Sequence, residues 1–423
     1  MNANEPTPEP PPPTPSSPRS PKKSSSSVGM LGVALLAVAI VGGVYYYIRS
    51  SESVPGIDTA SRLREYLAAQ ARASKLAPEY ADPDGDLVAN APADKAKLLN
   101  PAELTFSAIV SEDPDRAEAA WKPFLDALAK KTGKKVTYLK IYSSGVGAQT
   151  AFNSPKPIPK EGDNPIVVQP MELRTLEQQL EMLREGKLHV TALSTGQVKV
   201  GVNTAGFVPL FAPASEDGKF SYQLQVIVPA GSDAKSVGDL KGLSKSPIAF
   251  SAMSSNSGAK APLVLFKQDF GMLPGRDYEY IVTGDHEMSI LGVCWGFGQA
   301  TARRGGKVPE DNVATPLEGK YRAACVAGDI LQQMVERGEV KAEQFRTVFT
   351  SSNFPALCFG VPHNLDPTLR AAIEATFAEF RFEGNSVGER YKAQKRVKFV
   401  PVNYKADWKD VRDLDEKLSK LLD

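Results

Sequence analysis

The chain has 423 residues, of which 42% are hydrophobic and 23% charged, so it is long enough for two globular units plus accessory segments. Its net charge of +1 gives no general attraction to nucleic acid, which is not expected as a partner. With only three histidines and three widely separated cysteines, the sequence lacks the ligand spacings of a zinc site, and neither a metal nor another cofactor is expected. At most one pair of cysteines could form a disulfide, and three buried thiols are the alternative.

Residues 1–27 consist largely of proline and serine, in the run "MNANEPTPEPPPPTPSSPRSPKKSSSS". Proline removes backbone donors and favours an extended chain, so these residues are expected to form a disordered tail. The tail contains PxxP spacings that an SH3-type domain could bind, but an extended spacer is the favoured interpretation.

The next segment, Val28–Ile48, contains no charged residue and is long enough to span a bilayer as a helix. Tyr45–Tyr47 and Arg49 are typical of one membrane interface, and basic residues between positions 19 and 23 favour a cytoplasmic N-terminus. The prediction is therefore a single-pass inner-membrane anchor with an extracytoplasmic body. A cleavable signal peptide is the alternative, although the apolar run is long for one.

Residues 49–103 have the features of a stalk. The stretch "TASRLREYLAAQARASKL" has helical spacing, whereas "YADPDGDLVANAP" is an acidic turn that resembles a calcium loop only loosely. The globular body is expected to begin at Leu104.

From Leu104 onward, strand and helix patterns alternate. Strands are predicted over residues 104–110, 135–142, 188–194, 222–230, 246–252, 278–284, 321–328, 345–352 and 356–362, and helices over residues 115–133 and 171–186 and starting at Ser257, His286 and Asp329. Strands separated by such helices predict an α/β fold with parallel-type sheets. Sheets of this kind bind ligands at the carboxyl ends of their strands.

Ser254, Ser255, Asn256 and Ser257 directly follow the strand predicted over residues 246–252, where a helix begins. Their hydroxyl and amide groups, together with the free N–H groups of a helix start, would suit a tetrahedral oxyanion. Gly258 would let the backbone approach such a ligand. An ordinary turn with an N-cap is the alternative for this stretch alone.

Other strand ends carry similar residues. His286 stands at a predicted helix start, where the helix dipole favours its neutral form. Ser194 and Thr195 follow the strand predicted over residues 188–194, and Asp329 starts a further helix, where capping is the alternative role. Their joint occurrence predicts one shared binding site more strongly than any single residue does.

No catalytic signature accompanies these residues. The sequence contains no GxSxG, P-loop, GxGxxG or HExxH motif, so binding without chemistry is the simpler interpretation.

Five stretches, in this order, resemble the periplasmic substrate-binding proteins of phosphate, phosphite and phosphonate ABC importers, within the type II periplasmic binding protein superfamily. They are "SEDPDRAEAAWKPFLDALAKKTGKKV", "LEMLREGKLHVTALSTG", "AFSAMSSNSGAKAPLVL", "GDHEMSILGV" and "KFVPVNYKADWKDVRDLDEKL". Together they extend from about Leu104 to Leu421.

The resemblance implies two α/β lobes that close on a ligand like a flytrap. The first lobe would comprise residues 104–220 and 355–423, and the second lobe residues 221–354. The family's serine- and threonine-rich loop matches Ser254–Ser257, and its histidine matches His286. A tyrosine after the second strand would correspond to Tyr142, and an acidic residue to Asp329.

The chain also departs from the family pattern. Asn256 stands where threonine is common, and Val198 replaces the usual aromatic residue. One insertion falls beside Tyr142, and a second insertion carries Arg303 and Arg304. These departures weaken the assignment of the ligand more than that of the fold.

The leading hypothesis is a membrane-anchored solute-binding protein. It would capture a small oxyanion of the phosphate, phosphite or phosphonate type and present it to an ABC transporter permease. The alternative is a sensor or scaffold that signals through the membrane helix and the proline-rich tail.

Overall fold

The computed structural model describes residues 73–108, 114–140, 176–242, 246–296 and 320–421. The chain divides into two units, Met1–Asp58 and Thr59–Asp423, and all described residues belong to the second. The predicted tail, membrane segment and both insertions lie outside the described residues. Within the described ranges, no helix has both the length and the apolar character that crossing a bilayer requires.

Six strands form the first sheet, in the order β11-β4-β10-β3-β1-β2. They are β1 (Glu103–Ser107), β2 (Lys135–Tyr138), β3 (Val190–Leu193), β4 (Phe207–Ala214), β10 (Cys358–Pro362) and β11 (Lys398–Pro401). β1 runs parallel to β2 and β3, whereas β10 is antiparallel to both β3 and β4.

Five strands form the second sheet, in the order β7-β6-β8-β5-β9. They are β5 (Ser221–Pro229), β6 (Ile248–Phe250), β7 (Tyr280–Val282), β8 (Ala323–Ala327) and β9 (Phe345–Pro355). β6 is parallel to β7 and β8, and β5 is antiparallel to β8 and β9.

The prediction of parallel-type sheets is correct for the strand–helix–strand units and wrong for the strands that connect the sheets. The chain leaves the first sheet after β4 to enter the second at β5, and returns from β9 to β10. Each of these four strands pairs antiparallel with its neighbours in the sheet. Both sheets are therefore mixed.

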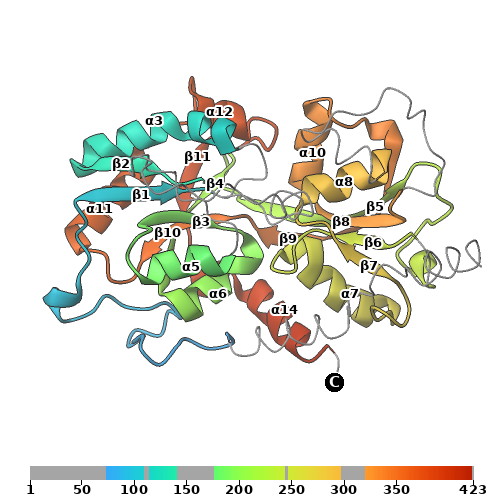
Figure 1. Ribbon diagram of the computed structural model, residues 1–423, viewed down its shortest axis with the longest axis horizontal. Helices are drawn as coiled ribbons and strands as arrows, with labels where there is room; N and C mark the ends of the chain where they lie inside the picture. Colours follow the sequence, from blue (N-terminus) through green and yellow to red (C-terminus); the bar gives the residue numbers. More distant parts are fainter. Residues whose placement is uncertain (1–72, 109–113, 141–175, 243–245, 297–319, 422–423) are drawn as a thin grey trace, which may run out of the picture. The chain divides into compact units, whose positions relative to one another are not determined.

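Helices cover the sheets (Figure 1). In the first-sheet part they are α3 (Pro114–Thr132), α5 (Leu176–Arg184), α6 (Thr195–Ala205), α11 (Pro367–Glu379), α12 (Ser386–Tyr391), α13 (Tyr404–Asp407) and α14 (Lys409–Ser419). In the second-sheet part they are a π-helix (Asn256–Lys260), α7 (Ala261–Phe270), α8 (His286–Trp295) and α10 (Gly328–Glu336). Short 3₁₀ turns occupy Lys95–Lys97, Gly238–Leu240 and Ala342–Gln344.

Sequence chemistry sets the helix ends. α3 starts with a proline, whose missing N–H is not required in a first turn, and stops before Gly133, which has φ +68°. α8 begins after Asp285, whose carboxylate accepts the N–H of Met288. The first-sheet core is aromatic, with Phe106, Trp121 and Phe359 in mutual ring contact.

The sequence patterns missed both α6 and β4. α6 was missed because residues 195–205 contain two glycines and three valines, which are poor helix formers. Cys294, Cys325 and Cys358 are buried free thiols, which settles the alternative that the sequence left open. Part of the predicted stalk packs on first-sheet residues: Ala77 N–H donates to Asn203 O, and Leu99 N–H donates to Asn364 O.

Candidate functional site

Ser254–Ser257, which follow β6 and are called the polar loop below, lead into a π-helix and not directly into an α-helix. Ser255 caps this helix, and its Oγ accepts the N–H of Gly258 at 3.0 Å. A side chain at Gly258 would collide with the Oγ of Ser251. Gly258 is therefore required for packing inside the loop.

His286 touches this loop from the start of α8. Its Nδ1 accepts the N–H of Ala327 at 3.2 Å, and its Nε2 lies 3.1 Å from Ser255 Oγ. Burial lowers the pKa of His286 to about 4, although Asp285 opposes the shift. Because Nδ1 accepts a hydrogen bond, the neutral ring carries its proton on Nε2 and donates it to Ser255.

The Ser255 hydroxyl thereby accepts two hydrogen bonds, from His286 Nε2 and from the N–H of Gly258. Its own proton is left to be donated to a third group. The arrangement makes Ser255 an oriented donor, which is what an anion requires.

Asn256 and Ser257 are the most buried polar residues of the loop, 1% and 0% exposed. Among the described residues, neither the amide of Asn256 nor the hydroxyl of Ser257 makes a hydrogen bond of good geometry, although both lie close enough to the Tyr222 hydroxyl to lower its pKa. Buried polar groups in proteins are almost always satisfied, so these atoms indicate a place where a ligand or water supplies the missing bonds.

The first sheet contributes the start of α6. Thr195 is buried, and its hydroxyl donates to Pro355 O at 2.7 Å. Ser194 is half-buried, and its N–H donates to Gln197 Oε1 at 3.2 Å. The amide of Gln197 in turn donates to Ser254 Oγ at 3.3 Å, which joins the two predicted loops.

Gly196 explains how closely these segments approach. A Cβ at this position would lie 2.7 Å from Asn256 N and would collide with Ser254 O. Glycine is required here because the backbones of α6 and of the polar loop are in contact.

Tyr222, in β5, lies among the predicted residues of both sheets. Burial raises the pKa of its hydroxyl, and the neighbouring polar groups of Ser257, Thr195 and Asn256 oppose that shift. The charge of Asp329 raises the pKa of Tyr222 further.

Asp329 is half-buried at the first turn of α10, and its Oδ1 accepts the N–H of Ile330. Burial raises the pKa of Asp329, whereas the charge of Arg396 lowers it. Arg396 donates to Lys219 O and Ser221 O, at the point where the chain enters the second sheet. The site thus combines neutral donors with one carboxyl group and one buried guanidinium.

The structure therefore brings together eight of the nine predicted site residues, and Tyr142 lies outside the described ones. Sequence reasoning missed Tyr222, Gln197 and Arg396. The first is the second residue of a connecting strand and the last is in a loop after α12, so no local motif marks either of them.

A separate acidic turn contains Asp82, Asp84 and Asp86, with one carboxylate oxygen of each within 4.8 Å of the others. Asp82 accepts the N–H groups of Asp86 and Leu87, and Asp84 accepts the side-chain amide of Asn90. Hydrogen bonds within the turn account for this arrangement.

Comparison with solved structures shows the same fold at low sequence identity. The binding protein component of an ABC phosphonate transporter from Pseudomonas aeruginosa is 14% identical, with a TM-score of 0.52, over 76% of this chain and 97% of that one. PhnD1 from Prochlorococcus marinus in complex with methylphosphonate is 12% identical, with a TM-score of 0.52, over 76% of this chain and all of that one.

No curated protein matches the chain in a sequence search. A sequence profile, described as "ABC transporter, phosphonate, periplasmic substrate-binding protein", does match, over residues 165–408, which is more than half of the chain. The match contains the polar loop, His286 and Asp329. The chain belongs to the family of periplasmic substrate-binding proteins of ABC phosphonate transporters.

Proposed function

We propose that this protein is a membrane-anchored solute-binding protein that captures a small phosphorus oxyanion, such as phosphate, phosphite or an alkylphosphonate, without transforming it. The bound anion would then be presented to an ABC transporter permease. The ligand would contact Ser254–Ser257, His286, Ser194, Thr195, Asp329 and, in addition, Tyr142.

The observation that carries the proposal is the oriented hydroxyl of Ser255. His286 Nε2 and Gly258 N–H occupy its acceptor side, so its proton can be donated to an oxyanion. The unpartnered polar atoms of Asn256 and Ser257 lie on the same loop and add further donors.

We also propose the domain arrangement that this function requires. Residues 104–220 and 355–423 would form one lobe and residues 221–354 the other, with closure around the ligand driven by its tighter binding to the closed state. Residues 1–27 would be a cytoplasmic tail, residues 28–48 a membrane helix, and residues 49–103 the connection to the periplasmic body.

Isothermal titration of the full-length chain in detergent, with phosphate, phosphite, methylphosphonate and sulfate, tests the ligand. We expect at least one phosphorus oxyanion to bind, and Ser255→Ala to weaken its binding about 10- to 100-fold, because a hydrogen bond to a charged group contributes roughly 1.5–3 kcal/mol. Ser352→Ala, on an exposed part of β9, is the matched control and should bind like the wild type. Absence of binding for all four anions would contradict the proposal.

Fractionation tests the anchor separately. The full chain should remain in the membrane pellet after alkaline carbonate extraction, and the mature protein should keep its N-terminal peptides in mass spectrometry, because an uncleaved apolar helix is retained by the bilayer. A chain lacking residues 1–48 should be extracted. Cleavage after the small-residue run "AVA" at Ala37–Ala39 would instead show a signal peptide.

A further inference from the structure

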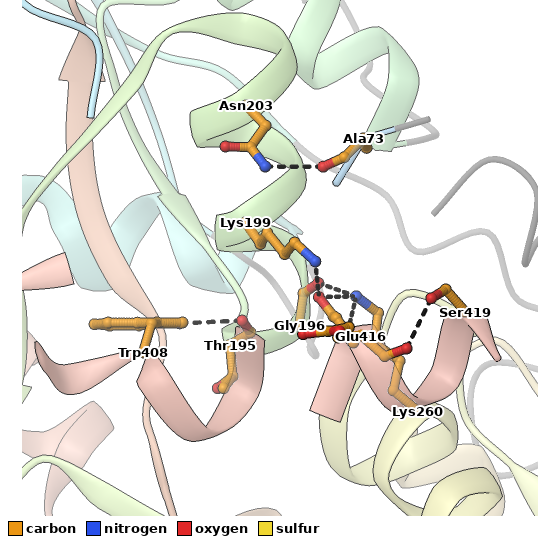
Figure 2. A network of polar contacts seen from close by, with 10 residues as sticks. Ala73, Thr195, Gly196, Lys199, Asn203, Lys260, Trp408, Glu416 and Ser419 are labelled. Carbon is orange, nitrogen blue, oxygen red and sulfur yellow. Dashed lines mark hydrogen bonds and ion pairs between the residues drawn. The ribbon is translucent and has the colours of Figure 1, made fainter. Parts of the chain in front are cut away.

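Lys199, Lys260 and Asp415 form a cluster of buried charged side chains, and Figure 2 shows the two lysines close to Gly196. Lys260, the last residue of the π-helix, is 0% exposed, and its Nζ lies 3.1 Å from Asp415 Oδ1 and 2.6 Å from Gly196 O. Lys199, on α6, is 7% exposed, and its Nζ is 3.9 Å from Asp415 Oδ2. Asp415 itself, on α14, is 2% exposed.

The cluster contains two ammonium groups and one carboxylate. Burial lowers the pKa of Lys199, whereas Asp415 and, more weakly, Glu416 raise it. Glu416 is exposed and paired with Lys420, so it neutralises the interior only in part. Arg412 adds further positive charge close by. Lys199, Lys260 and Arg412 are cationic and Asp415 and Glu416 are anionic, so these five groups together carry one net positive charge.

Both lysines belong to segments that carry the proposed ligand contacts. Lys260 is one helical turn beyond Asn256, and Lys199 is one turn beyond Thr195. The carbonyl that accepts the Lys260 ammonium belongs to Gly196, where a Cβ would lie 2.7 Å from Asn256 N. Both ammonium groups therefore belong to the two segments that meet where the anion would bind.

We propose that the buried positive charge of Lys199 and Lys260 raises the affinity of the site for an anion without touching it. The inference rests on the proposed function. An anion held by neutral donors at the loop would gain a favourable interaction with the excess charge, and the protein interior would screen that interaction only weakly. Asp415 would hold the two ammonium groups in place without cancelling both of them.

Lys199 is the residue with which to test this, because it makes the longer ion pair and keeps some exposure. In titrations of the full chain with phosphate, phosphite and methylphosphonate, Lys199→Met should bind about tenfold more weakly, since a unit charge about 10 Å away contributes roughly this factor at an effective dielectric constant near 20. Lys199→Arg keeps the charge and should bind within threefold of the wild type.

Two further measurements distinguish an effect of the lysine's charge from an effect of the substitution on folding. The tenfold difference between Lys199→Met and Lys199→Arg should persist from 50 to 500 mM NaCl, because buried charges are little screened. Lys187→Met, which removes an exposed lysine from the turn after α5, should bind like the wild type. Urea unfolding of each variant verifies folding, and Lys199→Gln provides a second neutral variant should the methionine destabilise the chain.

Equal affinity of the Met, Gln and Arg variants, in a protein whose wild type binds an anion, would overturn the inference and leave the proposed function intact. Failure of the wild type itself to bind any of the three anions would overturn the proposed function, and the inference with it.

Discussion

His286 shows how one backbone amide determines the chemistry of a side chain. The N–H of Ala327 occupies Nδ1, so the ring remains neutral and its other nitrogen donates to Ser255. Protonation of His286 at Nδ1 would point the new N–H of the ring at the N–H of Ala327. This geometry agrees with the effect of burial, which lowers the pKa of His286 to about 4.

A pH dependence of stability follows from this shift. An unfolded histidine titrates near pH 6.5, whereas His286 in the folded chain titrates at about 4, so the unfolded state binds more protons between these values. The free energy of unfolding should therefore fall as the pH drops from 6.5 to 4, with His286 contributing up to about 3 kcal/mol of that loss. Urea unfolding at pH 7.5, 5.5 and 4.5 would measure it.

His286→Gln should lose this part of the pH dependence. Burial also lowers the pKa of His189 and His363, but both remain in the variant, so the difference between wild type and variant isolates His286. An identical slope in the two proteins would show that the folded histidine titrates normally.

Residue-level prediction from the sequence had a clear limit. Residue type and position after a strand were enough to select Ser255 and His286, and the structure places their side chains 3.1 Å apart. Their partners were not predictable, because Ala327 is 41 positions from His286 and the segments meet through the pairing of β6 with both β7 and β8. Tyr222 was missed for the same reason.

At the level of elements, the start of α6 and the polar loop behave as one packed unit. Gly196 touches the loop backbone, Gln197 donates to Ser254, and Lys260 donates back to Gly196 O. The sequence could not show this unit, since it predicted neither α6 nor a π-helix. Local propensity does not favour a helix over residues 195–205, and packing against the first sheet and the loop overrides it.

Gly196→Ala tests this contact. The added Cβ would lie 2.7 Å from Asn256 N and would collide with Ser254 O, so the two backbones would have to separate. We expect the free energy of unfolding to fall by about 1–3 kcal/mol, as for other overpacking substitutions, and anion affinity to fall with it. Gly231→Ala is the matched control, since no atom lies within 4 Å of its Cβ position, and it should change stability by less than about 0.5 kcal/mol. Equal effects of the two substitutions would refute the close contact.

For the whole molecule, alternation of strand and helix patterns was sufficient to predict the α/β class, and the order of five stretches was sufficient for the family. Mixed pairing in both sheets was not predictable in this way. β5, β9 and β10 have ordinary strand patterns, and whether such a strand stays in its sheet or leaves it depends on contacts between segments more than a hundred residues apart.

The same connectivity leads to a prediction about ligand binding. Thr195 follows a strand of the first sheet, whereas Ser257 and His286 follow strands of the second, so a ligand that contacts all three must link the two parts. At a hundred times its dissociation constant the ligand should add about 2.7 kcal/mol of stability. Hydrogen exchange of the full chain should then slow in the first turn of α6 as well as in the π-helix and the first turn of α8, because opening either part would release the ligand. Slowing confined to the π-helix and α8 would mean that the anion is held by the second-sheet part alone, and Thr195 would then be a packing residue whose hydroxyl serves only Pro355 O.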